Sequence, residues 1–476
     1  MAIGQTSFLA LQFVGSVIVA RLLGPYDMGV FAVAMAVIGL ISVVQMVGLN
    51  TFLIREPKLT PEIVATAATV NLVITSLMAV GIAIMGLIGG SLFKEPGVRD
   101  MLLVLAVVPI IGQFAFVPNT MLEREGSFRT IAMVKIGSTA IGLAITIGLA
   151  MMGYRYMSLA YSQVATALLT NAAINLVARR HISFKMSLAH WSAMSRFGAQ
   201  IFAVAGLTRV AGRLMELTLG RTLGIDQLGL YTRASSNHAM VWDSIHGIVT
   251  RVVFADFSRC EREGVPLRER YLKILELMTG LLWPLFAGVA ILAGPAVHLI
   301  YGAKWTAAAP PLALLCIASM VLVSTTMSWE VFVVKGETGR QARFEFIRTA
   351  FGTSIFVAAC FYSLEAAAAT RIADALFAQY LYRPHLERMT TAKRSEFVSV
   401  YGRSAIAGLF AVAPALAVMA YWRFSTTTPL PQLGAAVVAG GIAWLVALRM
   451  MDHIIYHELR TVTARLGSAV AARRRA

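Results

Sequence analysis

Long apolar runs, separated by short polar segments, recur along the whole of this 476-residue chain. Each run is about 20 residues long, which is enough for an α-helix to cross a bilayer. The pattern predicts an all-α polytopic membrane protein with about 14 transmembrane helices. We expect these spans near residues 3–20, 28–49, 63–90, 100–121, 131–152, 156–178, 197–219, 228–254, 274–300, 309–334, 345–363, 365–382, 404–422 and 430–451.

One twelve-residue pattern occurs twice, at turns between hydrophobic runs. ARLLGPYDMGVF at 20–31 aligns without gaps with GRTLGIDQLGLY at 220–231, and the identical pairs are Arg21 and Arg221, Leu23 and Leu223, Gly24 and Gly224, and Gly29 and Gly229. A repeat of this length in a membrane chain indicates two bundles built from one ancestral unit. Gly24-Pro25 is expected to end one helix, and Gly29 to let two helices approach closely.

The repeat fixes the expected domain organisation. Six spans separate the two copies, so both halves are predicted to have the same orientation, as a parallel repeat. We predict an N-terminal six-helix bundle at 1–190 and a C-terminal six-helix bundle at 191–385. A C-terminal helix pair with a basic tail is expected to follow at 386–476.

The composition supports the membrane interpretation. The chain is 58% hydrophobic and only 14% charged, against roughly 25% charged residues in soluble domains, and its mean hydropathy is +0.73. The net charge of +17 does not indicate a nucleic-acid partner, because the basic residues lie between spans rather than in one patch. Their distribution is better explained by membrane topology and by contact with anionic membrane lipids.

The same basic residues predict the orientation. Twenty-four Lys and Arg residues fall at segments that follow even-numbered spans, and nine at segments that follow odd-numbered spans. The positive-inside rule then places both termini in the cytoplasm and the repeated turn on the outer side. The first run begins almost at Met1 without a basic lead, which favours a first span over a cleavable signal peptide. The longer polar segments near 179–196, 255–273 and 383–403 are expected to form cytoplasmic surface helices.

Three stretches resemble one family of transporters. They are ARLLGPYDMGVFAVAMAVIGLISVVQMVGLNTFLIRE from residue 20, LGLYTRAS at 228–235 and IYGAKWTAAAPPLALLCIAS at 300–319. They resemble signatures of the polysaccharide-transporter (Wzx/ExoT-like) flippases, which are members of the multidrug, oligosaccharidyl-lipid and polysaccharide exporter superfamily. The resemblance covers about the first 385 residues, whereas the last two spans match the fourteen-span members only in topology.

The resemblance implies a function and a location. Such proteins have two six-helix bundles around a central cavity and move an undecaprenyl-diphosphate-linked oligosaccharide across the bacterial inner membrane by alternating access. The exported repeat unit serves O-antigen, capsule or exopolysaccharide. The expected partners are therefore the lipid-linked oligosaccharide, membrane lipids and, as a further expectation, polysaccharide-assembly proteins. No cofactor, metal or enzymatic activity is implied.

Charged residues inside a span are the strongest candidates for transport, because each costs about 3 kcal/mol or more at the bilayer centre. Arg209, Arg213 and Glu216 share one face of the seventh span. Arginine binds phosphate through bidentate contacts and keeps its charge, so we expect Arg209 and Arg213 to bind the diphosphate and Glu216 either to orient them or to respond to a coupling cation. An internal ion-pair network that holds the second bundle together is the alternative. Arg21 and Arg221 are further candidates if they face the cavity between the bundles, although a tight hairpin is the simpler explanation of the motif.

Other polar residues in the spans have weaker signals. Asp243 and His246 suggest a proton relay, but an ion pair with Arg209 or Arg251 is the simpler interpretation. Arg371 and Asp374, three residues apart, are expected to form a local ion pair. Gln5, Gln12 and Gln45 are suited either to bind sugar or to join helices. His453 and His457 have the spacing of a zinc helix but no evident third ligand. Cys260, Cys316 and Cys360 have neither the spacing of metal ligands nor that of disulfides, and we expect them to be packing residues.

The sequence leaves three other classes of function open. One is a scaffold for a polysaccharide-assembly complex, which would not need arginines inside a span. A drug/cation antiporter of the same superfamily would favour an acidic, aromatic cavity, whereas the two arginines of the seventh span favour an anionic cargo. A membrane-embedded polysaccharide polymerase or ligase would need an outer catalytic apparatus, and the segments expected on that side are short. No P-loop is present to indicate ATP hydrolysis.

Overall fold

The computed structural model describes residues 2–93, 95–181, 186–189 and 191–461, and these residues form helices joined by short turns and loops, without strands. The chain divides into two compact units, residues 1–232 and 233–476. The division falls inside one long helix, α10 (Ile225–Arg262). The sequence-based boundaries at 190 and 385 remain predictions.

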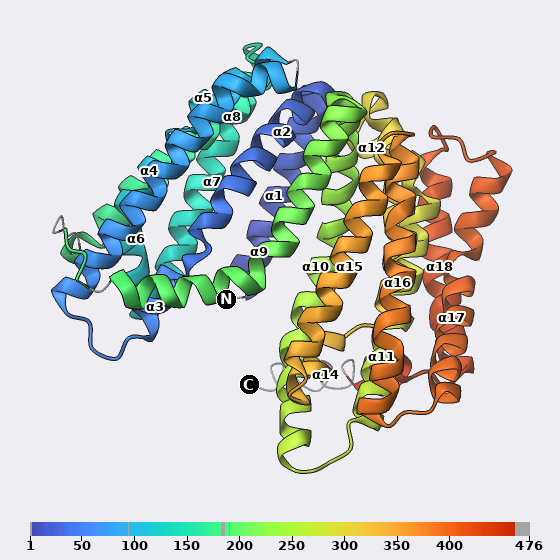
Figure 1. Ribbon diagram of the computed structural model, residues 1–476. Coiled ribbons are helices and arrows are strands. Elements are labelled where there is room, and N and C mark those ends of the chain that lie inside the picture. Colours follow the sequence, from blue (N-terminus) through green and yellow to red (C-terminus); the bar gives the residue numbers. More distant parts are fainter. Residues whose placement is uncertain (1, 94, 182–185, 190, 462–476) are drawn as a thin grey trace, which may run out of the picture. The chain divides into compact units, whose positions relative to one another are not determined.

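Unit 1 contains eleven helical segments ahead of α10 (Figure 1). They are α1 (Ala2–Leu22), α2 (Pro25–Ile41), η1 (Ser42–Val47), α3 (Leu49–Arg55), α4 (Pro61–Leu92), α5 (Pro96–Leu105), α6 (Val108–Arg124), α7 (Phe128–Met151), α8 (Met157–Val177), η2 (Arg179–His181) and α9 (Trp191–Thr222).

Unit 2 contains the rest of α10 and nine further segments. They are α11 (Arg268–Ile291), α12 (Ala293–Tyr301), η3 (Ala303–Ala308), α13 (Ala309–Val323), α14 (Ser328–Val334), α15 (Thr338–Ala359), α16 (Leu364–Thr390), α17 (Arg394–Tyr421) and α18 (Leu430–Met450). The closest packing in this unit is between α11 and α17, α13 and α16, and α17 and α18.

Several predicted spans are interrupted. The span expected at 28–49 breaks at η1 and at Gly48, which has a φ of +63° that favours glycine. The span expected at 100–121 divides between α5 and α6, just before Pro109. By length and composition, eight helical stretches of the described chain are apolar enough to cross a membrane. The predicted total of 14 is therefore not confirmed, although the multi-pass all-α class is.

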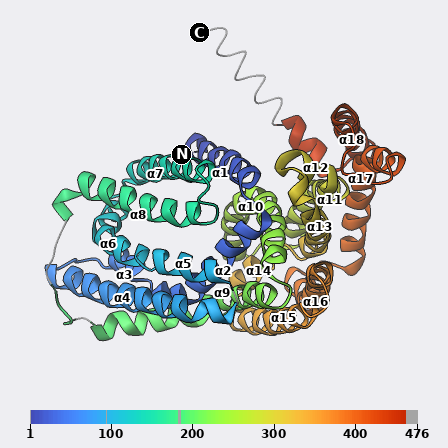
Figure 2. The same cartoon turned by 90° about the horizontal axis from the view of Figure 1, so that it is seen from above.

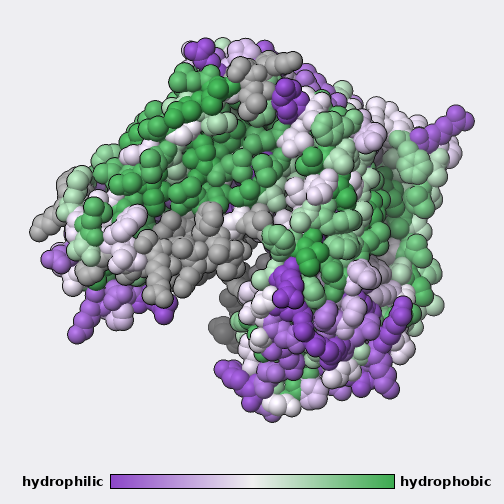
Figure 3. Space-filling view, viewed as in Figure 1, coloured by the Kyte–Doolittle hydropathy of each residue, from purple (hydrophilic) through white to green (hydrophobic). Residues whose placement is uncertain are grey.

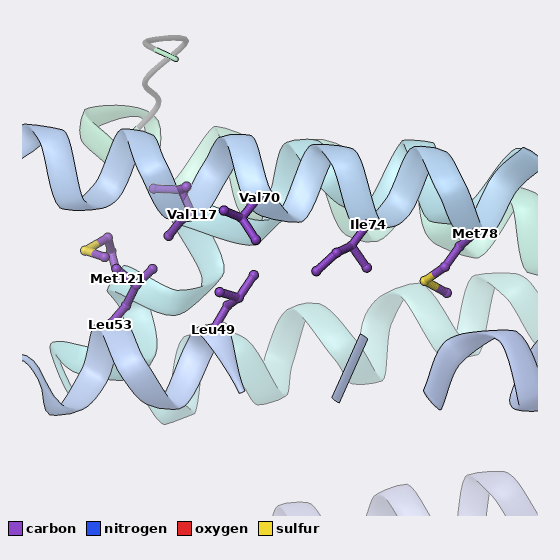
Figure 4. Packing of buried hydrophobic residues seen from close by; sticks show 8 residues of the cluster. Leu49, Leu53, Val70, Ile74, Met78, Val117 and Met121 are labelled. Carbon is purple, nitrogen blue, oxygen red and sulfur yellow. The ribbon is translucent and has the colours of Figure 1, made fainter. Parts of the chain in front are cut away.

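Apolar side chains pack between the helices and also cover their outer faces. One core of unit 1 joins α3, α4 and α6 through Leu53, Val70, Ile74 and Met121 (Figure 4). Large apolar residues such as Leu87 are more than half exposed, as expected for helices that face lipid. Figure 3 shows hydrophobic residues along the sides of the helices, and in unit 2 hydrophilic residues gathered around α14 and the adjoining ends of α10 and α11.

The polar segments are arranged differently from the prediction. The segment expected as a surface helix near 255–273 is divided between the end of α10 at Arg262 and the start of α11 at Arg268. The one expected near 383–403 is divided between α16 and α17. These polar residues therefore extend long helices rather than forming separate ones.

Candidate functional site

The two copies of the repeated motif lie against each other within unit 1. A Cβ atom at Gly29 would stand 2.8 Å from the carbonyl carbon of Ile225, and one at Gly229 would stand 2.8 Å from the carbonyl carbon of Pro25. The contact is reciprocal, because residues 25 and 29 of the first copy correspond to residues 225 and 229 of the second. The close approach expected from Gly29 is confirmed, and its partner is the other copy of the motif.

The two copies differ at their third helical position. Asp27, in the first copy, is 7% exposed; it accepts a hydrogen bond from the Gly24 N–H at 3.2 Å and lies 3.2 Å from Arg155 Nε. The second copy has Gln227 in the corresponding position. A buried carboxylate thus caps only the first copy, where it stabilises the helix start.

The three charged residues of the seventh span lie on α9. Arg213 Nη1 is 2.7 Å from Glu216 Oε2. The guanidinium stem lies against α2, where a Cβ at Gly39 would stand 2.9 Å from Arg213 Cδ. Arg209 is exposed one turn earlier, and no hydrogen bond or ion pair joins it to another described residue. One arginine is therefore held by a carboxylate while the other is available to a ligand.

The remaining charged candidates do not gather into one site among the described residues. Arg21 and Arg221 are both exposed, at the ends of α1 and α9. Asp243 is exposed on α10, and no ion pair between it and His246 occurs in the part of the chain that the structure describes. His246 Nδ1 lies 3.2 Å from Thr250 Oγ1. The side chains of Arg251 and Gln5 lie outside the described residues.

The ion pair expected from Arg371 and Asp374 is present in unit 2. Asp374 Oδ2 lies 3.3 Å from Arg371 Nη1 and 3.4 Å from Arg348 Nη1. Arg348 is also 2.8 Å from Glu345, which accepts a hydrogen bond from the Tyr382 hydroxyl at 2.9 Å. Asp374 is only 5% exposed, and its partners are partly buried, so the network ties α15 to α16 through a buried carboxylate that is paired with two arginines.

Unit 1 has a cavity of about 520 Å³, and the helices that line it, which include α2, α4, α6 and α8, can be followed in Figure 2. We call it the amide cavity, because its polar lining consists of amides and hydroxyls from η1, α3, α4, α6 and α8. Only Gln45 of this set was expected as a candidate from the sequence. The set comprises Ser42, Gln45, Asn50, Asn71, Asn119, Gln163 and Thr170. No charged residue is among the described residues that line it.

The amides of this cavity fall into two groups. Asn71 donates to Gln113, which in turn donates to the Ala68 carbonyl at 2.9 Å, and Asn119 donates to Glu123 at 2.8 Å. The bonds of Asn71 and Gln113 join α4 to α6, whereas the bond of Asn119 stays within α6. By contrast, Gln45 and Gln163 are exposed, and neither forms a hydrogen bond with another described residue. Isolated amides in otherwise apolar spans are the one sequence signal of such a site, although amides that link helices give the same signal.

Unit 2 has a cavity of similar size and opposite character. It measures about 530 Å³, has almost entirely apolar walls, and lies between α11, α13, α16 and α17. Its few polar groups bond to one another or to the backbone. Ser324 donates to Gln379 at 2.9 Å, Tyr401 donates to the Ser324 carbonyl at 2.6 Å, and Trp283 donates to the Met320 carbonyl at 2.7 Å.

The two histidines with zinc-like spacing contact different groups. His453 is fully buried; its Nδ1 accepts from the Ile455 N–H at 3.3 Å, and its Nε2 lies 3.7 Å from Glu276. Burial, followed by the positive charge of Arg403, lowers the pKa of His453 to about 4. His457 is exposed and lies 2.7 Å from Asp452. His453 is thus a neutral packing residue at the end of unit 2.

Known proteins share both the sequence pattern and the fold. A family described as "Polysaccharide biosynthesis protein" matches residues 18–310. The chain is 25% identical over 320 residues to the succinoglycan biosynthesis transport protein ExoT of Rhizobium meliloti (strain 1021), which covers 67% of this chain and 65% of that protein. It is 22% identical over 331 residues to the lipopolysaccharide biosynthesis protein WzxC of Escherichia coli (strain K12), with the same coverage.

These matches span about two thirds of the relatives' length, 65% in both cases. The fold is also similar to a solved structure of the lipid II flippase MurJ, with a TM-score of 0.73 and 14% identity over 96% of this chain and 99% of that one. At this identity the likeness establishes the fold alone.

Proposed function

The chain belongs to the polysaccharide biosynthesis protein family, and we propose that it is a flippase for a lipid-linked oligosaccharide. In this proposal, an undecaprenyl-diphosphate-linked repeat unit moves from the cytoplasmic to the outer leaflet of a bacterial inner membrane. The polymer exported from it would be O-antigen, capsule or exopolysaccharide. The protein itself catalyses no covalent step.

The exposed cation on α9 is the observation that carries the proposal. Arg209 has no partner among the described residues, although a charge in a membrane segment is costly unless it meets water, protein or ligand. Arg213 adds a second guanidinium one turn away, oriented by Glu216 at 2.7 Å. Two arginines on one helical face suit a diphosphate, because each can form bidentate contacts with phosphate oxygens. In this proposal Arg21 and Arg221 are secondary phosphate contacts.

The topology follows from the same proposal. Both termini lie in the cytoplasm, the two turns with Gly24 and Gly224 lie on the outer side, and about 14 spans form two six-helix bundles and a final pair. The excess of basic residues on one side supports this orientation. Asp243 and His246 are proposed to respond to a coupling ion, because both lie on α10 without an ion pair to each other in the described part of the chain.

A gene deletion tests the function in the source organism. Cells without the gene are expected to accumulate the lipid-linked oligosaccharide in the cytoplasmic leaflet and to lose the polymer outside. Complementation with the double variant Arg209→Ala/Arg213→Ala should restore less than a tenth of the export, because charge-assisted bonds to phosphate are worth about 1.5–3 kcal/mol each. The matched control is Arg449→Ala, at an exposed position in the last turn of α18.

The outcomes separate the alternatives. If polymer-linked lipid gathers in the outer leaflet instead, the protein acts after flipping, as a polymerase or ligase would. If no lipid-linked oligosaccharide accumulates and the cells become sensitive to cationic drugs, an antiporter replaces the proposed flippase. Equal export by the double variant and by Arg449→Ala, at equal protein levels, would remove the phosphate-binding role of α9.

A further inference from the structure

The amide cavity of unit 1 is too polar to be a packing defect. Empty cavities in proteins are generally apolar, whereas polar ones hold water or ligand. This cavity measures about 520 Å³, within the ~300–1,000 Å³ of typical ligand sites. Gln45 and Gln163, from η1 and α8, line it without hydrogen-bond partners among the described residues. Their donors and acceptors are available to a guest.

The chemistry of the lining identifies the guest. An amide offers two donors and one acceptor with two lone pairs, and a hydroxyl offers one donor and two lone pairs. A surface of amides and hydroxyls therefore matches a ligand that both donates and accepts at many points. The described lining carries no charge, so it provides no counterion for an anion or a cation. Its apolar members, which include Met78 and Phe116, suit the carbon faces of a ring.

We infer that the amide cavity is a binding site for an uncharged sugar residue, recognised through Gln45 and Gln163. This inference rests on the proposed function and extends it, because it separates recognition of the sugar from recognition of the diphosphate. The two sites adjoin the same helix. Met35 and Ile38 of α2 line the cavity, while Gly39, the next residue along, makes room for Arg213 of α9.

The paired amides have a supporting role in this site. Gln113 of α6 holds Asn71 of α4, and Glu123 holds Asn119 within α6. Such bonds fix the direction in which an amide presents its remaining lone pairs or protons. The site is thus partly preorganised, which reduces the entropy lost when a ligand binds.

Binding of the native lipid tests the inference. The ligand is the lipid-linked oligosaccharide extracted from cells that lack the gene, and the reference is the same lipid after its sugars have been removed enzymatically. Both are titrated against the purified full-length protein in detergent. Wild type should bind the glycosylated lipid more tightly than the bare diphosphate lipid. Gln45→Met/Gln163→Met should lose about tenfold or more of that preference, because each lost bond is worth about 1 kcal/mol.

The controls isolate the contribution of the sugar to the binding affinity. Gln227→Met makes the same chemical change at the outer turn of α10, away from the cavity, and should keep the preference. Affinity for the bare lipid should be the same for wild type and for both variants. An unchanged preference in Gln45→Met/Gln163→Met would overturn the sugar site while leaving the flippase proposal intact. Failure of wild type to bind either lipid would instead overturn the flippase proposal, and glutamine-dependent binding of sodium alone would assign the cavity to a cation.

Discussion

The two units solve the problem of polar groups in a membrane protein in different ways. Unit 1 has a cavity of about 520 Å³ with uncharged amides, two of which have no partner among the described residues. Unit 2 has a cavity of about 530 Å³ whose few polar groups are satisfied internally. The charges of unit 2 are instead gathered into networks such as that of Asp374. Unit 1 is therefore equipped to receive polar atoms from outside, and unit 2 is stabilised by its own.

Removing a charge from the unit 2 network is expected to have the largest effect. Asp374→Ala leaves Arg348 and Arg371 without their shared carboxylate, and breaking a buried pair costs about 3–5 kcal/mol. We expect a large fall in the unfolding temperature of the purified protein in detergent. Glu365→Ala, in the exposed first turn of the same helix, is the control. Similar unfolding temperatures for the two variants would show that the network does not stabilise unit 2.

Substitutions at the contact between the two repeated turns are expected to have the second-largest effect on stability. Gly29→Ala and Gly229→Ala each force a methyl group into the backbone of the opposite copy, and overpacking costs about 1–3 kcal/mol. Because the contact is reciprocal, the two variants should lower the unfolding temperature by similar amounts. Gly212→Ala on α9, where nothing lies within 4 Å of the added Cβ, should be neutral or slightly stabilising. A loss in only one of the glycine variants would contradict the equivalence of the copies.

The pH dependence of unfolding tests whether His453, at the end of unit 2, is buried as a neutral histidine. Unfolded histidine titrates near pH 6.5, whereas burial holds the pKa of His453 at about 4. As the pH falls from about 6.5 to 4, the unfolded state takes up a proton that the folded state does not, so stability decreases across that window. His453→Gln should reduce this slope, and His457→Gln, at an exposed position, should retain it. Identical slopes in wild type and His453→Gln would argue against a neutral buried histidine.

The smallest effect on stability is expected in the amide cavity. Gln45→Met/Gln163→Met removes no hydrogen bond between described residues, and substitutions away from packed features change stability by about 0.5 kcal/mol or less. The unfolding temperature should therefore stay close to that of wild type. A fall as large as that of Asp374→Ala would mean that these glutamines join helices, and the contrast between the units would disappear.

Much of the fold could be predicted from the sequence, because apolar periodicity and length determine a membrane helix directly. The breaks could not be predicted. Met327, between α13 and α14, has a φ of +59°, and the hydroxyl residues beside it, such as Thr326 and Ser328, are also tolerated inside continuous membrane helices. The contact between the two copies of the motif was predicted only in part. Gly29 indicated a close approach of two helices, but not that Ile225 would be its neighbour.

The candidate site was predicted less completely. Charged residues stand out in apolar spans, so Arg213 with Glu216 and Arg371 with Asp374 were both recognised, and both form ion pairs. Amides are less conspicuous because they are tolerated in spans as links between helices. Whether an amide links helices, as Asn71 does, or faces a cavity, as Gln163 does, depends on packing between distant segments.

Movement of the lipid across a bilayer tests the central claim most directly. The purified protein is reconstituted into vesicles that contain the native lipid-linked oligosaccharide, and the fraction exposed on the outside is followed after an enzyme has removed the sugars initially accessible there. The account predicts that wild type renews the exposed fraction faster than protein-free vesicles do, and that Arg209→Ala/Arg213→Ala slows this at least tenfold. Renewal at the protein-free rate by wild type, with the protein correctly folded, would contradict the account.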